Sequence, residues 1–146
     1  MINTLNLEKA KNLIKQSKEK TIIVKAQNIE FNRKILEYGK FNILLSIENN
    51  PEEYKSKKNL DSGLNHVLAK IAAKKNISIG IDMEEIKNLE KKEKAIRLSK
   101  IIQNIKICRK AKTKIKLLNF KDKRTAFSFI ISLGSSNQQA NEAIDF

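Results

Sequence analysis

Residues 61–86 read DSGLNHVLAKIAAKKNISIGIDMEEI, a helical pattern followed directly by an apolar strand pattern. If Asp61 or Ser62 caps the helix, it runs to about Asn76 and carries an apolar stripe at three- and four-residue spacing. The members of that stripe are Leu64, Val67, Leu68, Ile71 and Ala72. Residues 77–83 then form a strand that is apolar enough to be buried, so this stretch predicts one helix-to-strand step of an α/β fold.

The same alternation extends in both directions along the chain. Residues 49–59, which include Lys55, Lys57 and Lys58, predict an exposed polar loop. We therefore expect a single α/β domain over residues 1–146, with about four parallel strands and right-handed crossovers. The other predicted strands are 21–26, 41–48 and 113–120; the other predicted helices are Asn6 or Thr4 to about Lys18, 32–38, 91–112, Lys121 or Asp122 to Gly134, and a short helix starting at residues 135–137.

The long helix predicted at 91–112 has apolar residues at helical spacing, and these are expected to face inward: Ala95, Leu98, Ile101, Ile102, Ile105 and Cys108. Its cations are expected to lie outward or at the helix end: Arg97, Lys106, Arg109 and Lys110. Cys108 is the only cysteine, so it cannot form an internal disulfide, and we expect a small buried core residue rather than a catalytic thiol.

The chain has thirty Lys and Arg residues against sixteen Asp and Glu residues, a formal charge of +14, and the excess lies in one region. Residues 55–124 hold twenty-one basic and seven acidic groups, whereas residues 1–54 hold nine and seven, and the tail from Thr125 is acidic. An AT-rich genome would raise the lysine total but does not readily explain this uneven distribution. A polyanion gains free energy from such a surface by releasing counterions, so nucleic acid is the expected partner.

Several classes of protein do not fit the sequence. It contains no run of about eighteen apolar residues and no secretory signal, so we expect a soluble, cytoplasmic protein with no membrane partner. Common nucleotide-binding, zinc-protease and serine-hydrolase motifs are missing, and the single histidine, His66, cannot supply the ligands of common metallohydrolases. We therefore predict no catalytic residue, metal site or bound cofactor in the chain itself.

Several segments together resemble a known family. They are the Asn32-Arg33 pair, the SGLNHVLAK helix start at 62–70, the strand 77–81 closed by Gly80-Ile81-Asp82, and the helix end at 104–110. From about Thr21 to Gly134 the chain resembles ribonuclease P protein component three, the archaeal counterpart of the thirty-kilodalton eukaryotic subunit. The most specific part of the resemblance is the segment from Gly63 to Lys70.

The resemblance implies a TIM-barrel-like fold and a noncatalytic role in ribonuclease P, which removes the 5′ leader of precursor tRNA. Because the family's chains carry further βα units before this region, we expect a shortened or half-barrel version. Its edge strands, 21–26 and 113–120, would need cover from a partner, a second copy or a terminal helix. The implied partners are ribonuclease P RNA, precursor tRNA, ribonuclease P protein component two and the other ribonuclease P subunits, with a homodimer or heterotetramer as possible assemblies. Mg²⁺ would be used by the partner RNA.

Nine residues are candidates for RNA contact: Arg33, His66, Lys70, Lys74, Lys75, Arg97, Arg109, Lys110 and Arg124. His66, Lys70 and Lys74 fall at four-residue spacing on one helix face, as a backbone-binding surface requires. The arginines suggest positions where a planar donor fork is useful. His66 equally fits a core-edge residue bonded to a carbonyl, and each cation also fits ordinary solvated charge. Low aromatic content favours recognition of folded RNA by backbone and shape over stacking on single strands.

Two other functions stay open. Asp82, Glu84 and Glu85 follow a predicted strand, where barrel enzymes place active groups, and could hold Mg²⁺ in an enzyme acting on a phosphorylated substrate. The same acids also suit a helix N-terminus, where negative charge is favourable. A generic RNA-binding or RNA-chaperone protein would share the basic surface without a preference for ribonuclease P RNA.

Overall fold

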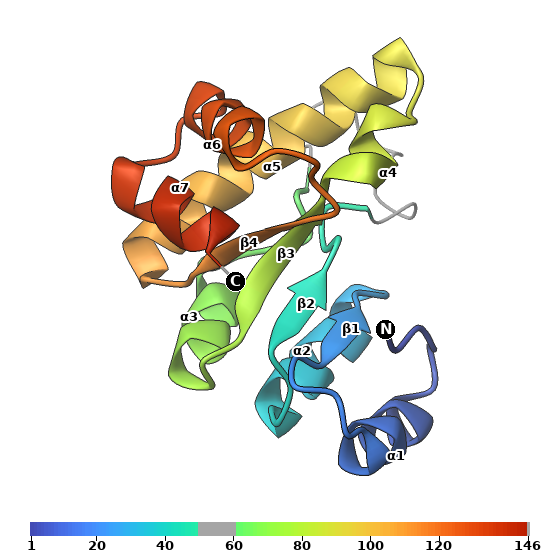
Figure 1. The fold of residues 1–146 in the computed structure, drawn as a ribbon. Coiled ribbons are helices and arrows are strands. Elements are labelled where there is room, and N and C mark those ends of the chain that lie inside the picture. The colour runs from blue at the N-terminus through green and yellow to red at the C-terminus, as the bar shows by residue number, and fades with distance from the viewer. Residues whose placement is uncertain (50–60, 146) are drawn as a thin grey trace.

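Four parallel strands form one sheet in the order β1-β2-β3-β4 in the computed structural model, which describes residues 1–49 and 61–145 (Figure 1). The strands are β1 (Ile23–Lys25), β2 (Ile43–Leu45), β3 (Ser78–Asp82) and β4 (Ile115–Leu118). The prediction of an α/β fold with a four-stranded, half-barrel-like parallel sheet is confirmed. The polar loop predicted at 49–59 lies, apart from Asn49, outside the described residues.

Polar caps begin most of the helices. A side-chain oxygen of the residue before the helix accepts a backbone N–H of the first turn in six cases, with Asn6, Asn28, Asn65, Asp82, Asp122 and Ser136 as the caps. The helices of the described residues are α1 (Leu7–Gln16), α2 (Ile29–Tyr38), α3 (His66–Lys74), α4 (Met83–Lys87), α5 (Lys91–Ala111), α6 (Lys123–Ser132) and α7 (Asn137–Ile144). None of them is long and apolar enough to cross a membrane.

The hydrophobic core lies between one face of the sheet and helices α2, α3 and α5 (Figure 1). Val24, Leu44, Ile79 and Ile115 stand in register across all four strands, and each is at most 1% exposed. The helices contribute Phe31, Ile35, Leu68, Ala72, Ile101, Ile105 and Cys108, and α6 and α7 extend the same cluster beside β4. This packing places the second half of α5 next to α3.

Segments from the two ends of the chain cover the edge strands. Ile2 forms a parallel bridge with Val24, since its N–H donates to the Ile23 carbonyl at 2.9 Å and its carbonyl accepts the Lys25 N–H at 2.8 Å. At the other edge α7 packs on β4, and the Lys116 ammonium donates to the Glu142 carbonyl at 2.8 Å. A terminal helix, one of the expected forms of cover, is therefore present at β4.

Helix α3 begins later than predicted, at His66 instead of Asp61 or Ser62. The Asp61 carboxylate accepts the Gly63 N–H at 2.9 Å, and Gly63 has φ +80°, so residues 61–65 form a turn. A Cβ on Gly63 would lie far inside contact distance of the Ile47 carbonyl oxygen, so this turn packs closely on the chain after β2. The prediction that Val67 lies on the inner stripe is wrong: it is 65% exposed, because α3 buries Leu68, Ala69 and Ala72 instead.

Helix α5 buries a more polar face than the sequence predicted. Ile101, Ile105 and Cys108 lie in the core as expected, whereas Ala95 is exposed and Leu98 and Ile102 are half-buried. The rest of the buried face is polar and consists of Arg97, Lys100 and Asn104. The first half of the helix therefore faces polar groups at the carboxyl ends of the strands instead of the apolar core. The expected outward position of Arg97 is wrong for this reason.

Candidate nucleic-acid interface

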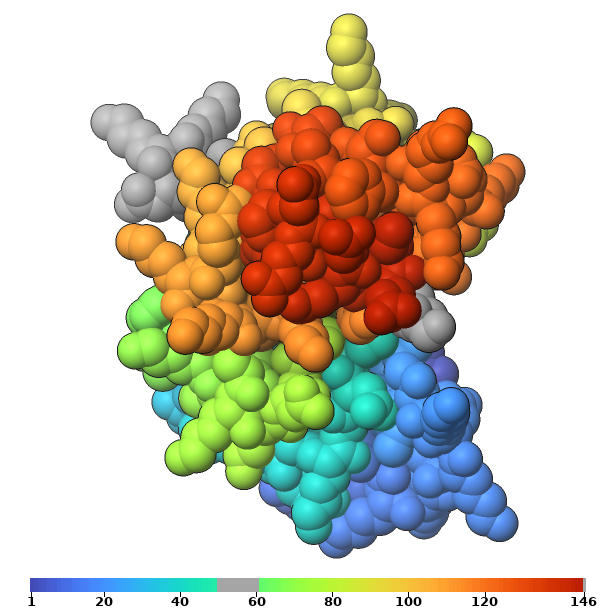
Figure 2. All heavy atoms as spheres, turned by 60° about the vertical axis from the view of Figure 1, so that its left-hand side comes forward, coloured from blue at the N-terminus to red at the C-terminus, as the bar shows by residue number. Residues whose placement is uncertain are grey.

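A groove of about 600 Å³ lies between the first turn of α3 and the second half of α5. Its lining consists of His66 from α3 and of Lys106, Ile107, Arg109 and Lys110 from α5. Figure 2 shows the end of α5, in orange, lying against α3, in green, on one side of the molecule. The fold thus brings together three of the predicted RNA-contact residues, which are His66, Arg109 and Lys110.

Two buried hydrogen bonds join α3 and its preceding turn to α5 and the residues that directly follow α5. At one end the Asn104 amide donates to the Ser62 carbonyl at 3.3 Å, and at the other the Thr113 hydroxyl donates to the Ala69 carbonyl at 2.7 Å. Cys108 is fully buried between these two positions. Burial raises the pKa of its thiol to about 12, so it is a packing residue and not a nucleophile. The groove is therefore a preorganised feature of the fold.

Cations continue from the groove along α3. Lys70 and Lys74 are exposed at four-residue spacing from His66, and Lys75 follows as the exposed C-cap. We call His66, Lys70, Lys74, Lys106, Arg109 and Lys110 the α3/α5 basic surface. Among residues 1–49 and 61–145 no acidic residue lines the groove, and none lies on α3, so no described carboxylate neutralises the cations there. The surface has the sign and spacing needed to contact successive phosphates.

Arg109 also holds the fold together. Its Nε donates to the Gln139 side-chain oxygen at 3.1 Å, and its Nη2 donates to the Gly134 carbonyl at the end of α6. The Gln139 amide in turn donates to the Ile105 carbonyl at 3.1 Å. Arg109 therefore joins α5 to the turn between α6 and α7, and only part of its guanidinium is available to a ligand.

The remaining candidates are dispersed or serve another purpose. Arg33 is exposed on α2 with Glu37 at 4.0 Å, and Arg124 is exposed at the start of α6; neither lines the groove. The groove residues that sequence reasoning did not put forward are Lys106 and Ile107. Lys106 precedes Lys110 by one helical turn, a spacing that could have indicated it.

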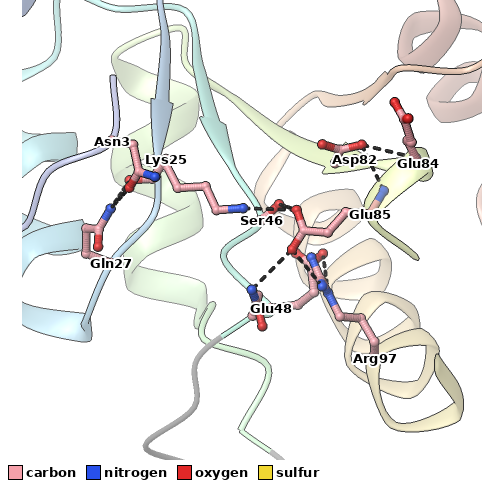
Figure 3. A network of polar contacts seen from close by, with 10 residues as sticks. Asn3, Lys25, Gln27, Ser46, Glu48, Asp82, Glu84, Glu85 and Arg97 are labelled. Atoms are coloured by element: carbon pink, nitrogen blue, oxygen red, sulfur yellow. Dashed lines mark hydrogen bonds and ion pairs between the residues drawn. The ribbon is translucent and has the colours of Figure 1, made fainter. Parts of the chain in front are cut away.

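Arg97 is a buried ion-pair partner. Its guanidinium lies 3.3 Å from Glu48 and 2.8 Å from Glu85, and its side chain is 3% exposed (Figure 3). Glu48 follows β2 into the interior, where an unpaired carboxylate would be costly, and Arg97 is the cation that compensates it. A phosphate cannot reach Arg97 without displacing these contacts, so the structure removes Arg97 from the exposed phosphate-contact candidates.

The same network engages Glu85 at the carboxyl ends of the strands (Figure 3). Three side chains donate hydrogen bonds to the Glu85 carboxylate: Lys25 at 3.0 Å, Asn49 at 3.1 Å and Ser46 at 3.3 Å. Burial raises the pKa of Glu48 despite the opposing charge of Arg97. Burial also acts to raise the pKa of Glu85, but the Lys25 hydrogen bond and the charges of Arg97 and Lys25 outweigh it and hold that pKa below its usual value.

The acids proposed as a metal site have structural contacts. One Asp82 carboxylate oxygen accepts the backbone N–H groups of Glu84 and Glu85 at 3.1 and 3.2 Å, which is the N-cap of α4. Glu84 is exposed, and Glu85 is ion-paired as described above. Within residues 1–49 and 61–145 no group of three or more His, Cys, Asp or Glu side chains is placed to hold a metal ion. These contacts favour the helix N-terminus interpretation of the acids.

No protein-family profile and no curated protein sequence matches the chain. Among solved structures, it is similar to a chain of the cryo-EM structure of archaeal ribonuclease P with mature tRNA. The TM-score is 0.73 at 21% sequence identity, and the match covers 97% of this chain. It covers 62% of the other chain, so this protein spans less than two thirds of that chain's length. At this level of identity the likeness is one of fold, and nearly all of this chain takes part in it.

Proposed function

We propose that the protein is a subunit of ribonuclease P that binds the catalytic RNA through the α3/α5 basic surface. The observation that carries this proposal is the fold likeness over 97% of the chain to a component of an archaeal ribonuclease P assembly. The location of the charge supports it, because, in the part of the chain that the structure describes, the groove lining and α3 carry cations and no acidic residue. The sequence resemblance to ribonuclease P protein component three points to the same assembly.

In this proposal the chain is noncatalytic. RNA and Mg²⁺ would carry out hydrolysis of the precursor tRNA, and the protein would neutralise phosphates and stabilise the RNA fold. Ribonuclease P protein component two would be the protein partner, contacting the less charged N-terminal part or the acidic C-terminal tail.

Reconstitution tests the proposed function directly. Cleavage of precursor tRNA by ribonuclease P RNA is measured at low Mg²⁺ with the other protein subunits, with and without this chain. Stimulation that requires both this chain and component two is expected. Absence of stimulation, with a folded protein and active control subunits, would refute the subunit assignment.

A pair of double variants tests which surface meets the RNA. Lys70→Glu with Lys74→Glu is expected to weaken binding and to lower the slope of log affinity against log salt by about 1 per lost phosphate contact. The matched control, Lys9→Glu with Lys15→Glu, makes the same charge change at exposed positions of α1. Equal losses in both variants would mean that net charge, and not the α3/α5 basic surface, governs binding.

A further inference from the structure

The α3/α5 groove has an apolar component, Ile107, between its cations. Ile107 is half-buried and packs against the core, and it lines the groove together with His66. Lys106 and Lys110 flank Ile107 on α5, one helical turn apart. A flat group lying on Ile107 would therefore have positive charge on either side.

The side chains around this apolar position are available to a ligand. Among the described residues, the side chains of His66, Lys106 and Lys110 form no ion pair and no hydrogen bond, and all three residues are exposed. The Asn65 side-chain oxygen accepts the Leu68 N–H and leaves the other N–H groups of the first turn of α3 without a cap. These N–H groups and the helix dipole favour an anion near His66. The bonds Asn104–Ser62 and Thr113–Ala69 hold both walls in place before a ligand arrives.

A regular duplex would use the groove poorly. Its phosphates lie on a convex surface and would contact the rim cations, leaving Ile107 without a partner. A nucleotide that leaves the helix exposes two flat apolar faces and carries phosphates on both sides, which matches the groove in shape, polarity and charge. The volume of about 600 Å³ lies within the roughly 300–1,000 Å³ usual for small-ligand sites.

The geometry points to a site for one unpaired nucleotide of the bound RNA. The base lies against Ile107 and His66, and its flanking phosphates meet Lys106 and Lys110. This inference rests on the proposed RNA-binding function and narrows it from backbone contact to capture of a bulged base. The low aromatic content of the chain excludes a platform for several bases, but a single base needs one imidazole and one aliphatic surface.

Three hairpin RNAs test the site. One carries a single bulged adenosine, the second is fully paired, and the third has the bulged sugar-phosphate without a base. The protein is expected to bind the bulged hairpin on the order of tenfold more tightly than the other two, the effect of one stacked base. Equal affinity for all three would overturn the site and leave backbone binding intact. If the abasic hairpin binds as tightly as the bulged one, and both more tightly than the paired one, backbone flexibility and not the base is recognised, which would overturn the site.

Variants assign the preference to named side chains. His66→Ala and Ile107→Ala are expected to abolish the tenfold preference without changing the salt dependence, whereas Lys70→Gln should weaken binding to all three hairpins and reduce the salt slope. His66 is exposed, so its variant carries the test if Ile107→Ala fails to fold. If the His66→Ala variant still prefers the bulged hairpin, the inference is overturned. It is also overturned if an acidic peptide displaces the RNA and that peptide binds the Ile107→Ala variant more weakly.

The outcomes separate this inference from the proposed function. Stimulated cleavage in the reconstituted enzyme together with no preference for the bulge would refute the nucleotide site alone. Failure of stimulation with a preserved preference for the bulge would refute the ribonuclease P assignment and leave an RNA-binding groove.

Discussion

Replacing Arg97 by Met tests whether this arginine is a structural ion-pair partner or an RNA ligand. Met keeps most of the length of the side chain but removes both contacts, to Glu48 at 3.3 Å and to Glu85 at 2.8 Å. Glu85 keeps Lys25 at 3.0 Å and is partly exposed. Glu48 is 1% exposed and, among the described residues, is ion-paired with Arg97, so the cost of the substitution falls on Glu48.

The size of the effect follows from this burial. At an effective dielectric constant of about 20, charges 3.3 Å apart attract by about 5 kcal/mol, and desolvation of both groups offsets part of this in the native protein. Removing one partner of a buried pair costs about 3–5 kcal/mol, because the other is left uncompensated or must take up a proton. With an m-value of about 1–3 kcal/mol/M in urea, the unfolding midpoint should fall by roughly 1–5 M.

Urea unfolding at neutral pH, followed by circular dichroism, measures this loss. Arg33→Met is the matched control, since Arg33 is exposed and its distance to Glu37 is 4.0 Å; it should change stability by less than about 0.5 kcal/mol. The double variant Glu48→Leu with Arg97→Met should recover most of the loss. A loss below about 1 kcal/mol for Arg97→Met, with RNA affinity and salt slope reduced, would refute the structural role and return Arg97 to the RNA-contact set.

Three further predictions concern the turn before α3, the acid limit of stability and the buried thiol. Gly63→Ala should lower the free energy of unfolding in urea by more than about 2 kcal/mol, because φ of Gly63 is +80° and the new Cβ would collide with the Ile47 carbonyl. Gly134→Ala is the control: φ is +101° but the space around it is open, so only the smaller cost of the backbone conformation is expected. Equal losses of stability in the two variants would contradict the collision. Glu85→Gln should make the free energy of unfolding depend less on pH in the acid range. The pKa of Glu85 is lowered in the folded protein, so its carboxylate stabilises the fold fully above the ordinary pKa of 4.5, and this stabilisation is lost as the pH falls through the pKa of the folded state. Acid unfolding that is unchanged in Glu85→Gln would refute this prediction. Cys108 should react with a thiol reagent only on unfolding, because burial raises its pKa to about 12; rapid labelling of the native protein would refute this.

The order and type of the elements follow from local features of the sequence. Apolar runs and helical periodicity predicted four strands and the main helices, and Asn6, Asp122 and Ser136 proved to be helix caps at or beside the predicted starts. Cys108 was correctly expected in the core. These features depend on a few neighbouring residues, so the sequence alone determines them.

The wrong predictions concern residues whose positions depend on contacts with residues far away in the sequence. The predicted start of α3 at Asp61 or Ser62 was wrong because Asn65 caps the helix and Gly63 packs on the Ile47 carbonyl, and no local signal reports that close packing. Arg97 was expected in solvent because cations on a lysine-rich helix are usually solvated. Its partner Glu48 lies 49 residues away in the chain, and only the packing of α5 over the end of β2 brings them together.

The candidate site divides in the same way. The sequence by itself determined a basic middle region and the common face of His66, Lys70 and Lys74, because helical spacing fixes which side chains share a face. It did not determine that His66 would stand opposite Lys106 and Lys110, or that Ile107 would lie between those cations. The tertiary structure decided that, because a groove exists only where two helices are held at a fixed separation by buried contacts between residues far apart in the chain.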